Sequence, residues 1–456
     1  MDILTASTLI KKRELSPVDL VKKSLDVIAE ENPKINALIT VSDKAIQSAK
    51  ELESELMSGN NRGALHGIPI AVKDLIFTKK MRTTMGSKVY ENYLPDIDAT
   101  VVKKLEDAGA IIIGKANTHE FAYGPIGDRS YFGACRNPHN PDKISGGSSS
   151  GSAAAVAAGM VSGTLGTDTG GSIRVPSSAC GVVGMKPTFG LVSKKGVFDL
   201  AYTLDHIGPI TTNIKDNALL LNILAGFDPE DPYSIRSERK DYSALIGQDI
   251  KGKVIGIPSF YFQQVDEEIQ AAISKCIALF ERLQVEIKKI DLNCMDEIAW
   301  AQAITIQSEA AAVHVKTMQK YKDDIDTEVY ERLAASREVK GYEYVESQMK
   351  RSRLIDEYNQ SFHDVDILLA PTLPMLPTDI GQREVLINNE KEGVRHALLR
   401  LTSPTNYTGN PSLSIPCGWS KSNLPIGVQL ISKHGNESEL YQFGYALEQS
   451  LKPSRK

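Results

Sequence analysis

The first sixty residues carry apolar side chains at every third or fourth position, a spacing that predicts amphipathic helices. Ser16-Pro17 supplies a helix start, because serine caps a first turn and proline fits its first position. Ser42 is expected to cap a further helix over residues 44–57. From residue 66 the spacing changes to a short apolar run that predicts a strand ending at Lys73 and Asp74.

Strand-like and helical segments then alternate along the rest of the chain. Strands are expected at residues 110–114, 253–257, 366–370, 411–416 and 425–431, and helices at residues 98–108, 266–283 and 437–451. Such alternation predicts an α/β fold in which helices cover a sheet. Residues 228–240, rich in charge and proline, are the best candidate for a domain boundary, but a long surface loop is the favoured interpretation.

Composition excludes several classes of protein. The 456 residues hold 52 Lys and Arg against 57 Asp and Glu, and this mild acidity argues against a nucleic-acid-coating surface. Five scattered cysteines without C-x-x-C spacing favour a reducing compartment over a disulfide or zinc scaffold. The N-terminus lacks a signal-peptide pattern, and no long apolar run predicts a membrane span. We therefore expect a cytoplasmic protein.

Glycine is concentrated in one segment, where residues 146–171 hold 8 of the 34 glycines. A flexible linker does not fit, because the alanine-rich residues 153–158 favour a buried helix. A nucleotide-binding loop does not fit either, because this segment lacks the lysine and the glycine spacing of such loops. A nucleophile elbow centred on Ser149 needs a preceding strand, whereas residues 137–143 are expected to form a turn-rich loop.

Two serines remain, Ser148 and Ser172, each directly after a glycine pair, with Lys73 at the end of an upstream strand. Singly, the lysine could be a solvated charge and each serine a helix cap. Together they closely resemble the amidase signature family, whose Ser-Ser-Lys triad hydrolyses carboxamides. The resemblance extends over most of the chain, through residues 65–69, 166–177, 184–188, 413–416 and 425–430.

The resemblance implies one amidase-signature domain over residues 1–456, an α/β fold with a large mixed twisted β-sheet covered on both faces by α-helices. Within it, residues 1–60 would be N-terminal helices, residues 61–220 the catalytic core, and residues 241–456 the remaining core and pocket elements. No metal and no cofactor is implied. The expected partner is a small-molecule amide, with no nucleic acid and no membrane, and a homodimer is left open.

In the family's pattern Ser172 is the nucleophile, Ser148 the bridge and neutral Lys73 the base, since a serine hydroxyl needs a base within reach. Burial must then lower the lysine pKa from about 10.4 to about 7 or 8. The resemblance also implies a cis peptide before Ser148. It places the backbone donors of an oxyanion hole at Thr169, Gly170, Gly171 and Ser172.

Further residues are assigned by the same comparison. Ala122, Tyr123 and Ser148 are expected to contact the substrate, and Asp168 and Ser149 to support the site. Arg174 could offer its planar guanidinium to a substrate carboxylate, but pairing with Asp168 is the favoured interpretation. Many relatives have glycine where this chain has Ser150, a departure whose effect the sequence does not predict.

The main alternative within the family is the glutaminase subunit of a tRNA-dependent amidotransferase. Residues 329–335 keep one arginine of its Lys-Arg-Arg segment, and Leu399 stands where an acid would hold the α-ammonium of glutamine. A stand-alone amidase is therefore favoured. A non-catalytic binding module is disfavoured because the triad is intact. Residues 342–362 and 398–401 are expected to line the acyl side, which favours an apolar or aryl acyl group.

Overall fold

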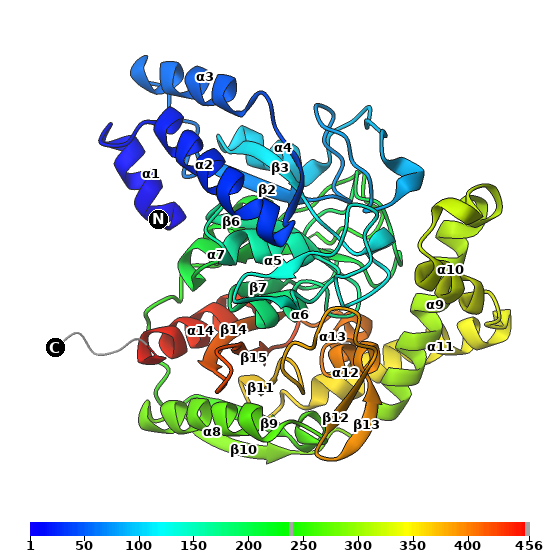
Figure 1. The fold of residues 1–456 in the computed structure, drawn as a ribbon. Helices are drawn as coiled ribbons and strands as arrows, with labels where there is room; N and C mark the ends of the chain where they lie inside the picture. The colour runs from blue at the N-terminus through cyan, green and yellow to red at the C-terminus, as the bar shows by residue number, and fades with distance from the viewer. Residues whose placement is uncertain (237–239, 452–456) are drawn as a thin grey trace.

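An eleven-stranded sheet forms the centre of the computed structural model, which describes residues 1–236 and 240–451 (Figure 1). The strand order is β1-β3-β2-β6-β8-β7-β14-β15-β11-β9-β10, with parallel and antiparallel pairs. The strands are β1 (Leu38–Val41), β2 (Pro69–Lys73), β3 (Ile111–Ala116), β6 (Gly163–Asp168), β7 (Val183–Lys186), β8 (His206–Thr211), β9 (Val254–Pro258), β10 (Glu286–Ile290), β11 (Ile367–Pro371), β14 (Ser412–Trp419) and β15 (Pro425–Ile431).

Helices cover both faces of this sheet. In β3 the side chains alternate, because Ile112 joins one hydrophobic cluster whereas Ile111 and Ile113 join another. The first cluster includes residues of α1 (Ile3–Lys11), α4 (Thr100–Asp107), α7 (Ile214–Leu224), α8 (Glu267–Arg282) and α14 (Glu437–Leu451). The second includes residues of α2 (Pro17–Ile35), α3 (Ala45–Met57) and α5 (Ser150–Ala157). The predicted fold class, a mixed sheet between helical layers, is confirmed.

The helix starts show where local sequence signals succeed and fail. Ser16 Oγ accepts hydrogen bonds from the N–H groups of Val18 (3.0 Å) and Asp19 (3.3 Å), so the predicted cap of α2 is present. The expected cap of α3 is wrong. That helix follows Lys44 without a side-chain cap, because Ser42 Oγ is used in a turn, where it accepts from Lys44 N (3.3 Å).

The segment before the paired serines also differs from expectation. Residues 137–143 belong to a small hairpin, in which β4 (Arg136–Asn137) pairs with β5 (Asn140–Ile144) apart from the main sheet. Its polar turn residues close the hairpin, since Asn137 Oδ1 accepts from His139 N (3.0 Å). A strand therefore precedes Ser149, although it is not a buried strand of the central sheet.

Three parallel strands determine where the functional residues gather. β3, β2 and β6 are neighbours and run in the same direction, so their carboxyl ends lie at one edge of the sheet. In α/β sheets such an edge is the usual place for a ligand site. Lys73 ends β2 and Asp168 ends β6 at this edge.

A group of helices stands at one side of the molecule (Figure 1). It contains α9 (Met295–Lys320), α10 (Thr327–Ser336) and α11 (Gly341–Gln360), with α10 and α11 both packed on α9. Near it lie a hairpin of β12 (Glu384–Ile387) and β13 (Glu390–Gly393), followed by α12 (Val394–Arg400), while α6 (Arg174–Cys180) and α13 (Pro404–Thr408) complete the core.

The candidate boundary at residues 228–240 is coil in its described part, and residues 237–239 lie outside the described residues. Asp228 fastens this coil to the protein by accepting from the hydroxyls of Thr100 and Ser193, both at 2.6 Å. No helix within the described residues is long and apolar enough to cross a membrane.

Candidate active site

Lys73 is fully buried at the end of β2. Its Nζ donates to Ser148 Oγ and to Thr167 Oγ1, both at 2.7 Å. Burial lowers the pKa of Lys73 to about 7, although the charges of Asp205 and Asp168 act in the opposite direction. An ammonium group with this pKa loses its proton near neutral pH, so Lys73 can act as a base there.

Ser148 lies in the loop that leads into α5, and its peptide bond with Gly147 is cis, as the family resemblance implied. The next serine, Ser149, is committed to the backbone of β6. Its hydroxyl donates to Thr167 O (3.0 Å) and accepts from Thr167 N (3.1 Å). Ser149 therefore anchors the loop, while Ser148 faces the lysine.

Ser150 was the departure whose effect the sequence left open. Its hydroxyl donates to Asn117 O (3.3 Å), and Lys73 donates to Ser148 instead. The extra hydroxyl thus fastens the start of α5 to the chain beyond β3.

Ser172 lies in the loop between β6 and α6, and only 5% of its surface is exposed. Ser149 N donates to Ser172 O (3.2 Å), which brings the two serine loops together. Within the described residues, Ser172 Oγ has no hydrogen-bond partner, so the contact from Ser148 Oγ to Ser172 Oγ is not formed in this structure. The Lys73–Ser148 half of the expected relay is present.

Four successive backbone N–H groups, those of residues 169–172, donate to no acceptor within the described part of the chain. The next two N–H groups, of Ile173 and Arg174, both donate to Asp168 Oδ2, at 3.1 and 3.4 Å. Buried N–H groups without a partner are rare in proteins, and a row of them is suited to a developing oxyanion.

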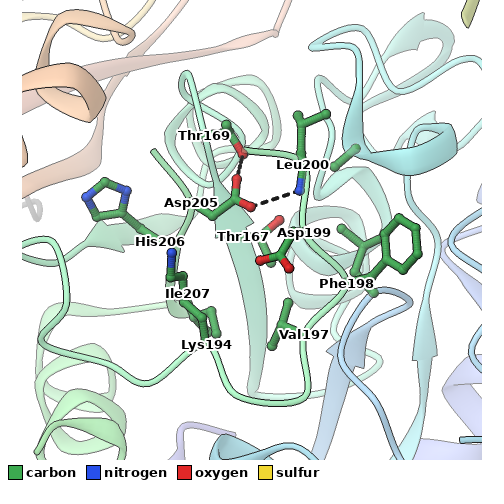
Figure 2. A pocket seen from close by; sticks show the side chains of 12 residues that line it. Thr167, Thr169, Lys194, Val197, Phe198, Asp199, Leu200, Asp205, His206 and Ile207 are labelled. Atoms are coloured by element: carbon green, nitrogen blue, oxygen red, sulfur yellow. Dashed lines mark hydrogen bonds between the residues drawn. The ribbon is translucent and has the colours of Figure 1, made fainter. Parts of the chain in front are cut away.

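The loop that carries these N–H groups is held from two sides. Thr402 Oγ1 donates to Gly170 O (2.6 Å). On the other side Thr169 Oγ1 donates to Asp205 Oδ1 (2.5 Å), while Asp205 Oδ2 accepts from Leu200 N (2.8 Å). Figure 2 shows both contacts of Asp205, which lie beside a small cavity of about 10 Å³. The backbone donors are thus fixed before any substrate binds.

The two glycines of this loop differ in their surroundings. A Cβ on Gly170 would meet nothing closer than 3.5 Å, and its neighbours would be Leu399 and Gln302. Gly171 has a φ of +139°, and a Cβ there would lie 2.2 Å from Thr402 Oγ1. A Cβ on Gly170 would therefore make ordinary van der Waals contacts, whereas Gly171 is required by both conformation and packing.

Arg174 is fully buried, and each of its five guanidinium N–H groups can be assigned to one acceptor. The acceptors are Asp168 Oδ2 (3.1 Å) and Oδ1 (3.0 Å), Thr405 Oγ1 (2.7 Å), Gln429 Oε1 (3.3 Å) and Asn406 Oδ1 (2.8 Å). Burial alone would raise the pKa of Asp168, but Arg174 outweighs it and holds that pKa well below its usual range. This is the pairing with Asp168 that the sequence favoured, and it leaves no guanidinium donor for a substrate carboxylate, the other possibility considered for Arg174.

A small pocket of about 20 Å³ contains Ser172 and adjoins a groove of about 540 Å³. Ala122 and Tyr123 line the small pocket, as expected. Leu399 lines both the pocket and the groove. Residues 342–362 were expected to line the acyl side, but none of them lines the small pocket. Most of them form α11, which packs on α9, and Ile306 of α9 lines the pocket in their place.

The sequence reasoning missed five residues that line the small pocket: Gly124, Pro125, Leu200, Ile306 and Arg395. Two of them come from helices far along the chain, Ile306 from α9 and Arg395 from α12. Neither lies in a motif, and each reaches the pocket only because distant helices pack beside the β6 loop. Near them Phe121 and Ala122 have positive φ values of 53° and 59°, a strained backbone that often marks a functional site. Among the described residues no cluster of His, Cys, Asp and Glu suits a metal ion.

Two sequence comparisons relate this chain to known proteins. A sequence model of the family described as Amidase matches residues 19–441. A glutamyl-tRNA(Gln) amidotransferase subunit of Thermoanaerobacter pseudethanolicus is 38% identical over 470 residues, covering 97% of this chain and 95% of the relative.

Two solved structures extend the comparison. One, described as "An unexpected vestigial protein complex reveals the evolutionary origins of an s-triazine catabolic enzyme", has a TM-score of 0.95 at 31% identity and covers 99% of this chain and 100% of its own. The native peptide amidase from Stenotrophomonas maltophilia has a TM-score of 0.88 at 28% identity, covering 99% of this chain and 97% of its own.

Fold, site and comparisons together define an enzyme that hydrolyses the C–N bond of amides. The chain belongs to the amidase signature family.

Proposed function

We propose that this protein is an amidase in which Ser172 attacks the amide carbonyl, Ser148 relays the proton and Lys73 accepts it. The observation that carries the proposal is the 2.7 Å contact between Lys73 Nζ and Ser148 Oγ in a fully buried setting. When Lys73 is neutral, the Ser148 hydroxyl can donate to the nitrogen lone pair. Its oxygen is then free to accept the proton of Ser172.

In the proposed mechanism the reaction passes through an acyl-enzyme. Ser172 Oγ forms a bond to the carbonyl carbon while its proton passes to Ser148 and that of Ser148 passes to Lys73. The N–H groups of residues 169–172 stabilise the oxyanion of the tetrahedral intermediate, where one such donor is worth about 3 to 4 kcal/mol. Lys73 returns a proton through Ser148 to the departing amine. Water then cleaves the acyl-enzyme by the same route and releases a carboxylate.

A fluorophosphonate tests the nucleophile directly. Incubation followed by intact-mass measurement and peptide mapping should place a single adduct on Ser172. Lys73→Ala should slow labelling by about 10²- to 10⁴-fold, the range for loss of a general base. Ser150→Ala is the matched control, because its hydroxyl faces Asn117, and it should label at the wild-type rate. An adduct on Ser149, or unchanged labelling of Lys73→Ala, contradicts the mechanism.

A second candidate function is glutamine hydrolysis within a multi-subunit amidotransferase, favoured by the 38% identical relative. In that case other protein chains and tRNA would be partners, and the sequence expectation of no nucleic acid has no support from the comparisons. Against it, Leu399 lines the pocket at the position where an acid would hold the α-ammonium. Ammonia release from glutamine alone among amides, and only with added partner proteins, would favour this candidate.

A further inference from the structure

Arg395 is the charged residue of the small pocket that contains Ser172, and its side chain also lines the larger groove. Within the described residues its guanidinium makes no hydrogen bond and no ion pair, and Nε is buried without a partner. Its guanidinium carbon lies 5.9 Å from the centre of the Tyr123 ring. A partly buried guanidinium without an acceptor is costly unless a ligand supplies one.

The neighbouring arginines already have acid partners. Glu328 pairs with Arg332 (2.9 Å), Arg129 (3.1 Å) and Arg383 (2.8 Å). Arg383 also pairs with Asp128 (2.9 Å). These two acids are therefore bonded to other arginines, and Glu328 acts on Arg395 only through its charge, without an ion pair in the described part of the chain.

One further group, His119, agrees with positive surroundings. Burial, together with the charges of Arg332 and its neighbours, holds the pKa of His119 well below its ordinary value. Burial and the charge of Arg332 also lower the pKa of Arg395, although Tyr123 and Glu328 act in the opposite direction. The shared environment of these side chains thus favours an anion and disfavours a second cation.

We infer that Arg395 binds a carboxylate of the substrate, so that this enzyme acts on an amide that carries a carboxylate a few bonds from the scissile carbonyl. The inference rests on the proposed function, which places the scissile carbonyl at Ser172. A planar guanidinium offers paired donors to a carboxylate, and such charge-assisted bonds are the strong ones. The acyl group is then anionic, in place of the apolar or aryl group that the sequence favoured.

Three amides of similar size test the charge requirement. Glutaramate carries a carboxylate, 5-oxohexanamide replaces it with a neutral methyl ketone, and glutamine adds an α-ammonium. The shorter malonamate and succinamate test the spacing. We expect kcat/KM for the preferred carboxylated amide to exceed that for the neutral one by roughly 10- to 100-fold. Glutaramate should also exceed glutamine, because no acid in the pocket receives the ammonium.

Arg395→Gln should remove the preference for the carboxylate, whereas Arg395→Lys should keep part of it. Arg400→Gln is the matched control, because this arginine of the same groove is already bound by Glu392 (3.1 Å) and should leave the preference in place. Equal rates on charged and neutral amides, or a preference that survives Arg395→Gln, would overturn the inference.

Two readouts separate this inference from the proposed function. Fluorophosphonate labelling of Ser172 reports the nucleophile and should proceed in Arg395→Gln. Calorimetry with glutarate, succinate and malonate reports the anion site without turnover, and Arg395→Gln should weaken the tightest of them by about tenfold or more. If Ser172 is labelled but no dicarboxylate binds, the carboxylate site at Arg395 is contradicted and the proposed function is not. If dicarboxylates bind in a way that depends on Arg395 but Ser172 is not labelled, the proposed function is contradicted and the carboxylate site is not.

Discussion

Lys73 shows how the environment of a single residue sets its chemistry. In water a lysine is charged at neutral pH, but here burial lowers its pKa to about 7. The Lys73 amine donates to the hydroxyls of Ser148 and Thr167, and no carboxylate in the described part of the chain is bonded to it. The fold thus keeps a base available where a solvated lysine would be protonated.

This pKa predicts how activity depends on pH. Protonated Lys73 cannot accept a proton, so the labelling rate of Ser172 should fall about tenfold per unit well below pH 7 and level off above it. The rate of fluorophosphonate labelling from pH 5 to 9 measures this, after correction for hydrolysis of the reagent. A rate that stays constant from pH 5 to 8 would show that Lys73 is not the base.

At the scale of elements, the loop from β6 to α6 combines backbone donors with two glycines of different function. Gly170→Ala should preserve stability but lower kcat/KM about tenfold or more, because its methyl group points to Leu399 and Gln302 beside the pocket. Gly171→Ala should lower both activity and stability, the latter by about 1–3 kcal/mol, since φ is +139° and Thr402 blocks the Cβ.

Kinetics and urea unfolding of the two variants, side by side, check this difference. Equal stability of both would contradict the packing argument. A fully active Gly170→Ala would show that the space beside this glycine is not used by the substrate.

Elements with a clear apolar period were predictable from the sequence. β15 was predicted with its observed limits, and β2, β3 and β9 within three residues at each end. β1 and the hairpin strand β5 were not, because short partly exposed strands lack that period. Lys73, Ser148 and Ser172 could be selected through family motifs, whereas the pocket residue Arg395 could not, since only long-range packing of α12 brings it there.

At the scale of the whole molecule, Arg174 joins parts of the chain that are distant in sequence. Its guanidinium connects Asp168 at the end of β6 with Asn406 of α13 and Gln429 of β15. The network lies directly behind the β6 loop, so the same contacts position the site and connect the two halves of the sheet. We propose on this basis that residues 1–456 unfold as one domain.

Arg174→Met should therefore destabilise the protein by about 3–5 kcal/mol, because it leaves the buried Asp168 carboxylate without its cation. Arg353→Met is the matched control, since its pairs with Glu297 and Glu357 are exposed and worth about 1 kcal/mol or less. Urea unfolding should show one transition, shifted in the first variant. Two separate transitions, with only one shifted, would contradict a single domain.

The arrangement of the pocket has an evolutionary consequence. Arg395 and Leu399 are one helical turn apart on α12, whereas the proposed reacting groups come from β2 and the loops before α5 and α6. On the proposed assignments, substitutions at these two positions are expected to change the acyl preference and to leave the proposed reacting groups in place. We therefore expect relatives with different substrates to differ at these two partly exposed positions of α12.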